Sequence, residues 1–111
     1  MVDRTFWRIV RTNPPAERDF LSNEAQGVPP RDDDPETLRL WSGISMYATR
    51  TQARRTAITY PFLGRFLAEV RLSDNTGIQW ERTRGRGHYT IWGEARILLI
   101  SVVQVVPIQD D

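Results

Sequence analysis

The segments after residue 64 form a succession of strand-like stretches separated by short turns, and this succession restricts the chain to folds that contain a sheet. Residues 65–72 alternate, with Phe, Ala, Val and Leu on one face. Residues 78–83 and 88–92 contain aromatic and β-branched side chains, which favour strands. Between them, residues 73–77 have the composition of a turn, and residues 84–87, RGRG, form a flexible basic loop.

The apolar run from Ile97 to Val106 near the end of the chain admits two interpretations. The first is one long buried strand. The second is a one-turn helix over 94–98, followed by a strand over 99–106. Hydrophobic periodicity alone does not decide between them, because a short apolar run suits a buried helix as well as a buried strand.

The first half of the chain combines helical and strand-like segments. TFWRIV, residues 5–10, favours a strand because aromatic and β-branched residues dominate it. SMYAT precedes a helix whose N-terminus carries a capping box of Thr49 and Gln52. We therefore expect a strand over 44–49 and helices between Asn13 and Gly27, from Pro35 to Gly43 and over 50–58, the last with Ala53, Ala57 and Ile58 facing inward.

These elements indicate an α+β protein, with helices mainly in the N-terminal half and antiparallel-rich β-sheets in the C-terminal half. The chain has 111 residues, which is enough for one hydrophobic core and too little for two. We therefore expect a single domain over 1–111, with its core over 5–106. Residues 28–34, VPPRDDD, are expected to form an exposed, acidic, proline-rich loop.

Composition excludes several classes of protein. Hydrophobic residues make up 40% and charged residues 26% of the chain, which excludes wholesale disorder. No stretch of about 18 apolar residues is present, so no membrane partner is expected, and the start of the chain lacks the apolar region of a signal peptide. The absence of cysteine excludes disulfides, cysteine-zinc sites and thiol catalysis. A cytoplasmic location is therefore expected.

All fifteen basic residues are arginine, and the net charge is only +1. The guanidinium group is a planar fork of donors that suits carboxylates and phosphates. The most basic window, RTRGRGH over residues 82–88, holds three arginines and the only histidine. Arg86 is a candidate contact for nucleotide phosphates, and the alternative is a hairpin loop whose arginines are solvated. A nucleic-acid-binding module using this loop is a further alternative, which the low net charge disfavours.

Two residues near this window are candidates for chemistry. His88 begins a strand just after a glycine and could donate to a phosphate or a ribose hydroxyl. Its alternative is a structural histidine paired with a backbone carbonyl. Glu94 could accept from sugar hydroxyls or stabilise a cationic transition state, or it could be an acid favoured at a helix N-terminus. No Walker loop, GxGxxG or HExxH motif is present, and no metal is expected.

The order of the FWRIV strand, a helix, the SMYAT strand, the ARRTA helix and the FLAEVRL strand resembles the compact ADP-ribosyltransferase fold, including RES-type toxins. In that family an NAD cleft is lined by an arginine or histidine on the first strand, a tyrosine on a second strand and a late polar residue. The resemblance implies that NAD, as substrate, binds in a cleft between small sheets. It also implies a transferase or an NAD-cleaving enzyme, whose transition state resembles an oxocarbenium ion.

The resemblance assigns roles to particular residues of this chain. Arg8 would hold the NAD phosphates or ribose, and Tyr47 would stack on nicotinamide. Ser45 and Thr49 would flank Tyr47 on the same strand face. The third position, near the nicotinamide ribose, would fall to Glu94 or else to His88. The alternative for Tyr47 is a half-buried strand tyrosine with a satisfied hydroxyl.

A further hypothesis, besides an NAD-binding enzyme and a nucleic-acid-binding module, is a non-enzymatic interaction subunit. Four tryptophans and four phenylalanines are many for a chain of this size, and an exposed cluster of Trp7, Trp41, Trp80 and Trp92 would mark an interface. The apolar C-terminal strand could also pair at a sheet edge and form a homodimer.

Overall fold

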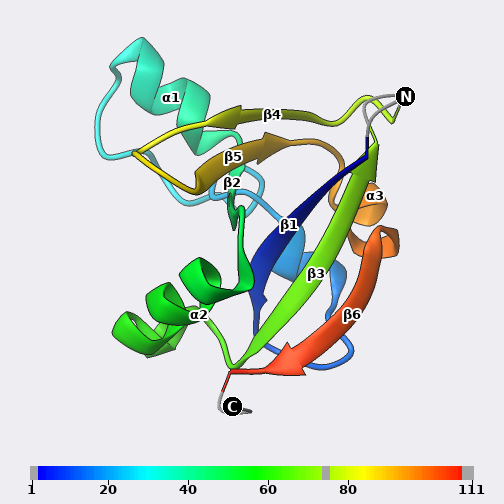
Figure 1. Ribbon diagram of the computed structural model, residues 1–111. Helices are drawn as coiled ribbons and strands as arrows, with labels where there is room; N and C mark the ends of the chain where they lie inside the picture. The colour runs from blue at the N-terminus through cyan, green and yellow to red at the C-terminus, as the bar shows by residue number, and fades with distance from the viewer. Residues whose placement is uncertain (1–2, 74–75, 109–111) are drawn as a thin grey trace.

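The computed structural model describes residues 3–73 and 76–108. They form an α+β fold around a six-stranded sheet of order β4-β5-β2-β1-β3-β6, in which all neighbouring strands are antiparallel (Figure 1). The strands are β1 (Asp3–Val10), β2 (Ile44–Tyr47), β3 (Phe66–Ser73), β4 (Gln79–Arg82), β5 (His88–Trp92) and β6 (Val102–Pro107). The α-helices are α1 (Pro35–Trp41), α2 (Arg50–Thr59) and α3 (Ala95–Ile100), and two 3₁₀ turns are η1 (Glu17–Phe20) and η2 (Pro61–Leu63).

The sheet consists of two three-stranded parts that meet at one point. Strand β1 pairs with β3 along its whole length, from Asp3 to Val10. Its register with β2, among the residues described, consists of the pair Trp7–Tyr47. Figure 1 shows β4 and β5 running across the direction of β1 and β3. The two parts of the sheet therefore diverge on either side of the Trp7–Tyr47 pair.

Successive side chains of β1 point to opposite faces of the sheet and pack into two different hydrophobic clusters. Phe6 and Val10 are fully buried in the larger cluster, which includes Phe20 of η1 and Leu98 of α3. The smaller cluster contains Ile9 and the alanines of α2. Because alanine side chains are small, α2 packs closely against the strands. Helices α2 and α3 thus cover opposite faces of the β1–β3 region.

The four tryptophans, the residues singled out for an interaction surface, are all partly buried. Trp80 packs against the larger cluster and Trp7 against the smaller one. Among residues 3–73 and 76–108, the most exposed large apolar side chains are instead Phe62 and Ile100, at 75% and 76%.

The α+β class is confirmed, but the expected division between the two halves is not. Strands β1 and β2, from the first half, are the two central strands of the sheet, and α3 lies in the second half. The described strands form one sheet rather than separate small sheets. The divided interpretation of the apolar C-terminal run is confirmed, because α3 ends at Ile100 and β6 begins at Val102. The expected turn at 73–77 lies partly outside the described residues.

The helix expected between Asn13 and Gly27 is wrong, since only η1 forms there as a helical segment. The carboxylate of Asp19 accepts hydrogen bonds from the backbone N–H groups of Arg11 and Ala16, at 3.0 and 2.9 Å. The Asp19 side chain thereby ties the end of β1 to the start of η1, and this local arrangement competes with a longer helix.

In α2 the N-cap half of the predicted capping box is confirmed, because Thr49 Oγ1 accepts from the Gln52 N–H at 3.2 Å, but Gln52 Oε1 accepts from the Thr49 hydroxyl at 3.0 Å rather than from the Thr49 backbone. Ile58, however, is 53% exposed, whereas Ala53 and Ala57 are buried. The buried face of this helix is narrow, and Ile58 follows Ala57 with a rotation of about 100° that takes it out of that face.

Candidate functional site

A cleft of about 840 Å³ opens where the two parts of the sheet separate. Strands β1 and β2 and the loop after η1 contribute part of its lining. Helix α1, the segment from the end of α2 to η2, and the loop between β4 and β5 contribute the remaining lining. The lining thus draws on segments far apart in the sequence.

Arg8 lies at the point where β1 and β2 separate. Its Nε donates to the carbonyl of Asp19 at 3.0 Å, and its Nη1 donates to the carbonyl of Ser45 at 2.8 Å. Burial lowers the pKa of Arg8 to about 10, with Asp19 and Tyr47 acting in the opposite direction. Arg8 is therefore still cationic at neutral pH, and it places a positive charge on the cleft lining.

Polar side chains of β2 and β5 form a second part of the lining. Ile44 and Met46 of β2 point into the larger cluster, so Ser45 and Tyr47 lie on the other face. The antiparallel register pairs Tyr47 with His88, and their rings stand 5.4 Å apart at an interplanar angle of 80°. The Tyr47–His88 ring pair therefore lines the same cleft as Arg8.

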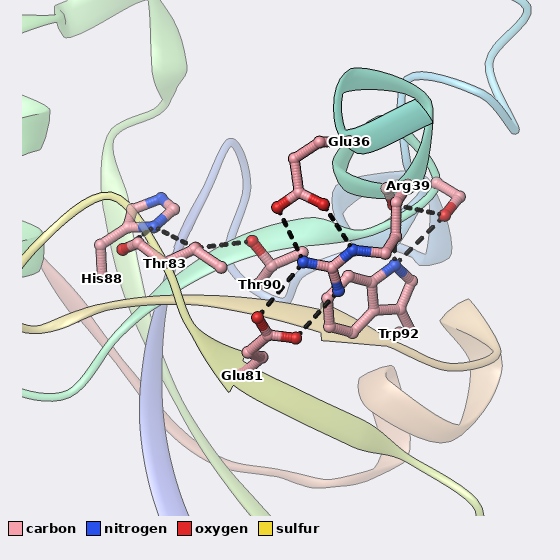
Figure 2. Close-up of polar contacts among 8 residues, drawn as sticks. Glu36, Arg39, Glu81, Thr83, His88, Thr90 and Trp92 are labelled. Atoms are coloured by element: carbon pink, nitrogen blue, oxygen red, sulfur yellow. Dashed lines mark hydrogen bonds and ion pairs between the residues drawn. The ribbon is translucent and has the colours of Figure 1, made fainter. Parts of the chain in front are cut away.

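His88 contacts the side chains of Ser45 and Thr83 and, through Thr83, is connected to Thr90. Its Nε2 lies 3.0 Å from Ser45 Oγ, and its Nδ1 lies 3.2 Å from the Thr83 carbonyl and 3.0 Å from Thr83 Oγ1. Thr83 Oγ1 in turn lies 2.8 Å from Thr90 Oγ1, as Figure 2 shows. The two contacts of Nδ1 differ in kind: the Thr83 carbonyl can only accept and requires a proton on Nδ1, whereas the Thr83 hydroxyl can also donate to Nδ1 and would leave the proton on Nε2.

Burial lowers the pKa of His88 below its ordinary value of 6.5, and Arg84 acts in the same direction while the Thr83 carbonyl opposes both. Below pH 6.5 the unfolded chain therefore binds a proton that the folded protein binds less readily. We expect the free energy of unfolding to fall as the pH drops below about 6.5 and to stop falling once folded His88 is protonated. The slope stays under about 1.4 kcal/mol per pH unit, the limit for one proton.

Urea unfolding at a series of pH values measures this effect. His88→Gln removes the titrating group and should lose this component of the pH dependence. An unchanged profile in the variant would contradict the assignment.

Helix α1 is held to the sheet by Arg39, whose guanidinium lies between two carboxylates (Figure 2). It donates to both oxygens of Glu36 at 2.8 and 2.9 Å and to both oxygens of Glu81 at 2.9 and 3.2 Å. The hydrogen bond from Arg39 lowers the pKa of Glu36. Arg39 Cζ lies 5.2 Å from the centroid of the Trp92 ring, and Trp92 Nε1 donates to the Arg39 carbonyl at 3.1 Å. This network fixes the α1 side of the cleft.

The cleft is positively charged overall. Five arginines and three acidic residues line it: Arg8, Arg11, Arg18, Arg31, Arg84, Asp19, Asp34 and Glu36. Two of these acids are engaged, because Asp19 accepts from backbone N–H groups and Glu36 is bound to Arg39. The lining therefore favours an anionic ligand.

Two exposed aromatic residues also line the cleft. Tyr60 and Phe62 are 51% and 75% exposed, and their rings lie 6.1 Å apart in an edge-to-face arrangement. Large apolar side chains that remain exposed beside a cleft can contact a ligand.

Four of the seven predicted site residues meet in this cleft: Arg8, Ser45, Tyr47 and His88. The other three do not line it. Glu94 precedes α3 and lies 3.6 Å from Arg96. Thr49 caps α2. Arg86 lies in a separate hollow of about 380 Å³ in the basic loop.

Sequence reasoning missed several residues of the lining. Arg84 lines both the cleft and the hollow, and it adopts a positive φ of 54°, which is uncommon for a residue other than glycine. The RGRG pattern did not distinguish it from Arg86. Tyr60 and Phe62 flank Pro61, which signals only the end of a helix.

Comparison of the chain with protein-family models, with curated proteins and with solved structures gives no match in any of the three. None of the described helices has both the length and the apolar character that crossing a bilayer requires. Within residues 3–73 and 76–108, no group of three or more His, Asp or Glu side chains is suitably placed to hold a metal ion.

Proposed function

We propose that this cleft binds NAD or a closely related dinucleotide, as the resemblance to the ADP-ribosyltransferase fold implies. The observation that supports the proposal is the common position of Arg8 and Tyr47. These residues come from different strands, and both line one positively charged cleft. The side chains assigned to phosphate or ribose and to nicotinamide are therefore close enough to serve one ligand.

The size and chemistry of the cleft suit a dinucleotide. Its volume of about 840 Å³ lies within the usual range for ligand pockets, roughly 300–1,000 Å³. Arginine forks bind phosphate oxygens in pairs, and Arg8 and Arg84 supply two of them. The Tyr47–His88 pair and the Tyr60–Phe62 pair provide two groups of rings, one for each base of the dinucleotide.

Glu94 does not supply a carboxylate to this cleft. Of the three carboxylates that do line it, Asp19 is bound to backbone N–H groups and Glu36 to Arg39, and Asp34 stands at the N-cap of α1, away from strands β1, β2 and β5. The proposed function is therefore nucleotide binding, with His88 as the neutral titratable group beside the ligand rather than a carboxylate that stabilises an oxocarbenium ion.

A thermal-shift titration with NAD tests the proposal. We expect Tm to rise with NAD concentration, because a ligand that binds only the folded state stabilises it by about 2.7 kcal/mol at one hundred times its Kd. Nicotinamide riboside is the matched control: it lacks the phosphates and the adenosine half, so it should give a much smaller shift. No shift at millimolar NAD would overturn the proposal.

A further inference from the structure

The contact between Ser45 and His88 has the arrangement of an activated hydroxyl. Ser45 pairs with Thr90 and Tyr47 with His88, so Ser45 and His88 are diagonal neighbours on the same face of two strands. Ser45 Oγ lies 3.0 Å from Nε2, and both residues are half-buried. Both also line the cleft, so a ligand in the cleft can reach the hydroxyl.

The imidazole is oriented as a base. In the tautomer whose Nδ1–H donates to the Thr83 carbonyl, the lone pair of Nε2 accepts the Ser45 proton. A serine, a histidine and a third group that orients the histidine make up the arrangement found in nucleophilic catalysis. Here the third group is a backbone carbonyl instead of a carboxylate.

Positive charge surrounds this pair. Arg8 Nη1 donates to the backbone carbonyl of Ser45 itself, so a guanidinium lies next to the hydroxyl-bearing residue. Arg84 lies close enough to influence the charge state of His88, and it lines the same cleft. Such charges select a substrate that carries an anionic group, and they favour the negative charge that develops on oxygen during attack.

We propose that Ser45 is a nucleophile, activated by His88, that attacks the carbonyl carbon of an ester carrying an anionic group. This inference goes beyond nucleotide binding, and it stands whether or not NAD binds in the cleft.

The reaction balances without a further cofactor. Ser45 Oγ bonds to the carbonyl carbon while its proton passes to Nε2 of His88. The tetrahedral intermediate then expels the alcohol, which takes the proton from His88 and leaves an acyl group on Ser45. Water attacks this acyl-enzyme, again giving its proton to His88, and releases the acid and free Ser45.

Labelling with a fluorophosphonate probe tests the nucleophile directly. Mass spectrometry of the intact protein and of its peptides should show one adduct, on Ser45. Ser45→Ala should abolish the adduct. Ser22→Ala is the matched control, because Ser22 also lines the cleft but its Oγ accepts from the Ala25 N–H, at 3.0 Å. That variant should be labelled like the wild type, and absence of an adduct on wild-type Ser45 would overturn the proposal.

The role of His88 has two independent measurements. His88→Gln should slow labelling by at least about 100-fold, in line with the usual contribution of a general base. In the wild type the labelling rate should rise with pH, with a midpoint below 6.5, and then level off near neutrality. Equal labelling of the variant and the wild type, or a rate independent of pH between about 4.5 and about 8, would exclude His88 as the base.

The preference for an anionic ester is tested with two chromogenic esters. The p-nitrophenyl hemiester of succinic acid should be hydrolysed faster than p-nitrophenyl acetate. Arg84→Asn should reduce this preference, measured as the ratio of kcat/KM for the two esters, and asparagine tolerates the positive φ of this position. Faster hydrolysis of the neutral ester would contradict the proposed substrate class.

Discussion

Arg8→Gln should bind NAD about 10- to 150-fold more weakly than the wild-type protein. The variant loses a cation from the cleft, and a hydrogen bond to a charged group contributes about 1.5–3 kcal/mol. Arg8 also donates to two backbone carbonyls, so the variant will be less stable as well. Calorimetric titration should therefore be performed at a temperature at which circular dichroism shows the variant to be folded.

Arg71→Gln is the matched control for this experiment. It removes the same charge from an exposed position on β3 that does not line the cleft. Because salt screens charges that are more than about 8–10 Å apart, NAD affinity should change little in this control. Equal losses in the two variants would show that only net charge matters, and this would contradict binding at Arg8.

Replacement of Phe6 by alanine is expected to lower the free energy of unfolding by about 3–5 kcal/mol. Phe6 is 0% exposed, and its ring lies 5.6 Å from that of Trp80 and 5.0 Å from that of Tyr89. It therefore links β1 with the β4–β5 hairpin, and its removal leaves a cavity between them. Urea unfolding measures the change as a lower midpoint at unchanged slope.

Phe62→Ala gives the opposite combination of effects and serves as the control. Phe62 is 75% exposed, so the free energy of unfolding should change by no more than about 0.5 kcal/mol. NAD affinity should nevertheless fall, because stacking of a base on an aromatic ring contributes about 1–3 kcal/mol. A stability loss in Phe62→Ala as large as that in Phe6→Ala would contradict the division between core and cleft.

Much of the strand content could be predicted because it follows from local alternation. The faces of β1 and β3 are read directly from apolar spacing, and the observed burial agrees, with Phe6, Val10, Ala68 and Val70 buried in one cluster. The cap at Thr49 could also be predicted, since it needs only residues three apart. The loop after β1 could not, because it depends on the Asp19 side chain accepting from the backbone N–H groups of Arg11 and Ala16.

The candidate site was predicted in part for the same reason. Ser45 and Tyr47 share a strand face, which alternation shows, and His88 begins the strand that pairs with them. Whether Glu94 and Thr49 reach the cleft depends on how distant elements pack. Each of them is the N-cap residue of a helix, and that role accounts for its residue type without any ligand. A single sequence without tertiary information does not separate these two roles.

The meeting of the two sheet halves at Trp7–Tyr47 has a consequence for how this chain can change over evolutionary time. Beyond that pair the Ser45 carbonyl accepts from the Arg8 guanidinium, so a side chain rather than a backbone N–H connects the two strands there. Under the proposed function, one side chain therefore both stabilises the contact between the strands and binds the ligand. Substitutions of Arg8 that change the ligand preference of the cleft should also weaken the contact between β1 and β2. We therefore expect changes in ligand preference to arise first at Arg84 and Phe62, which also line the cleft, and only later at Arg8.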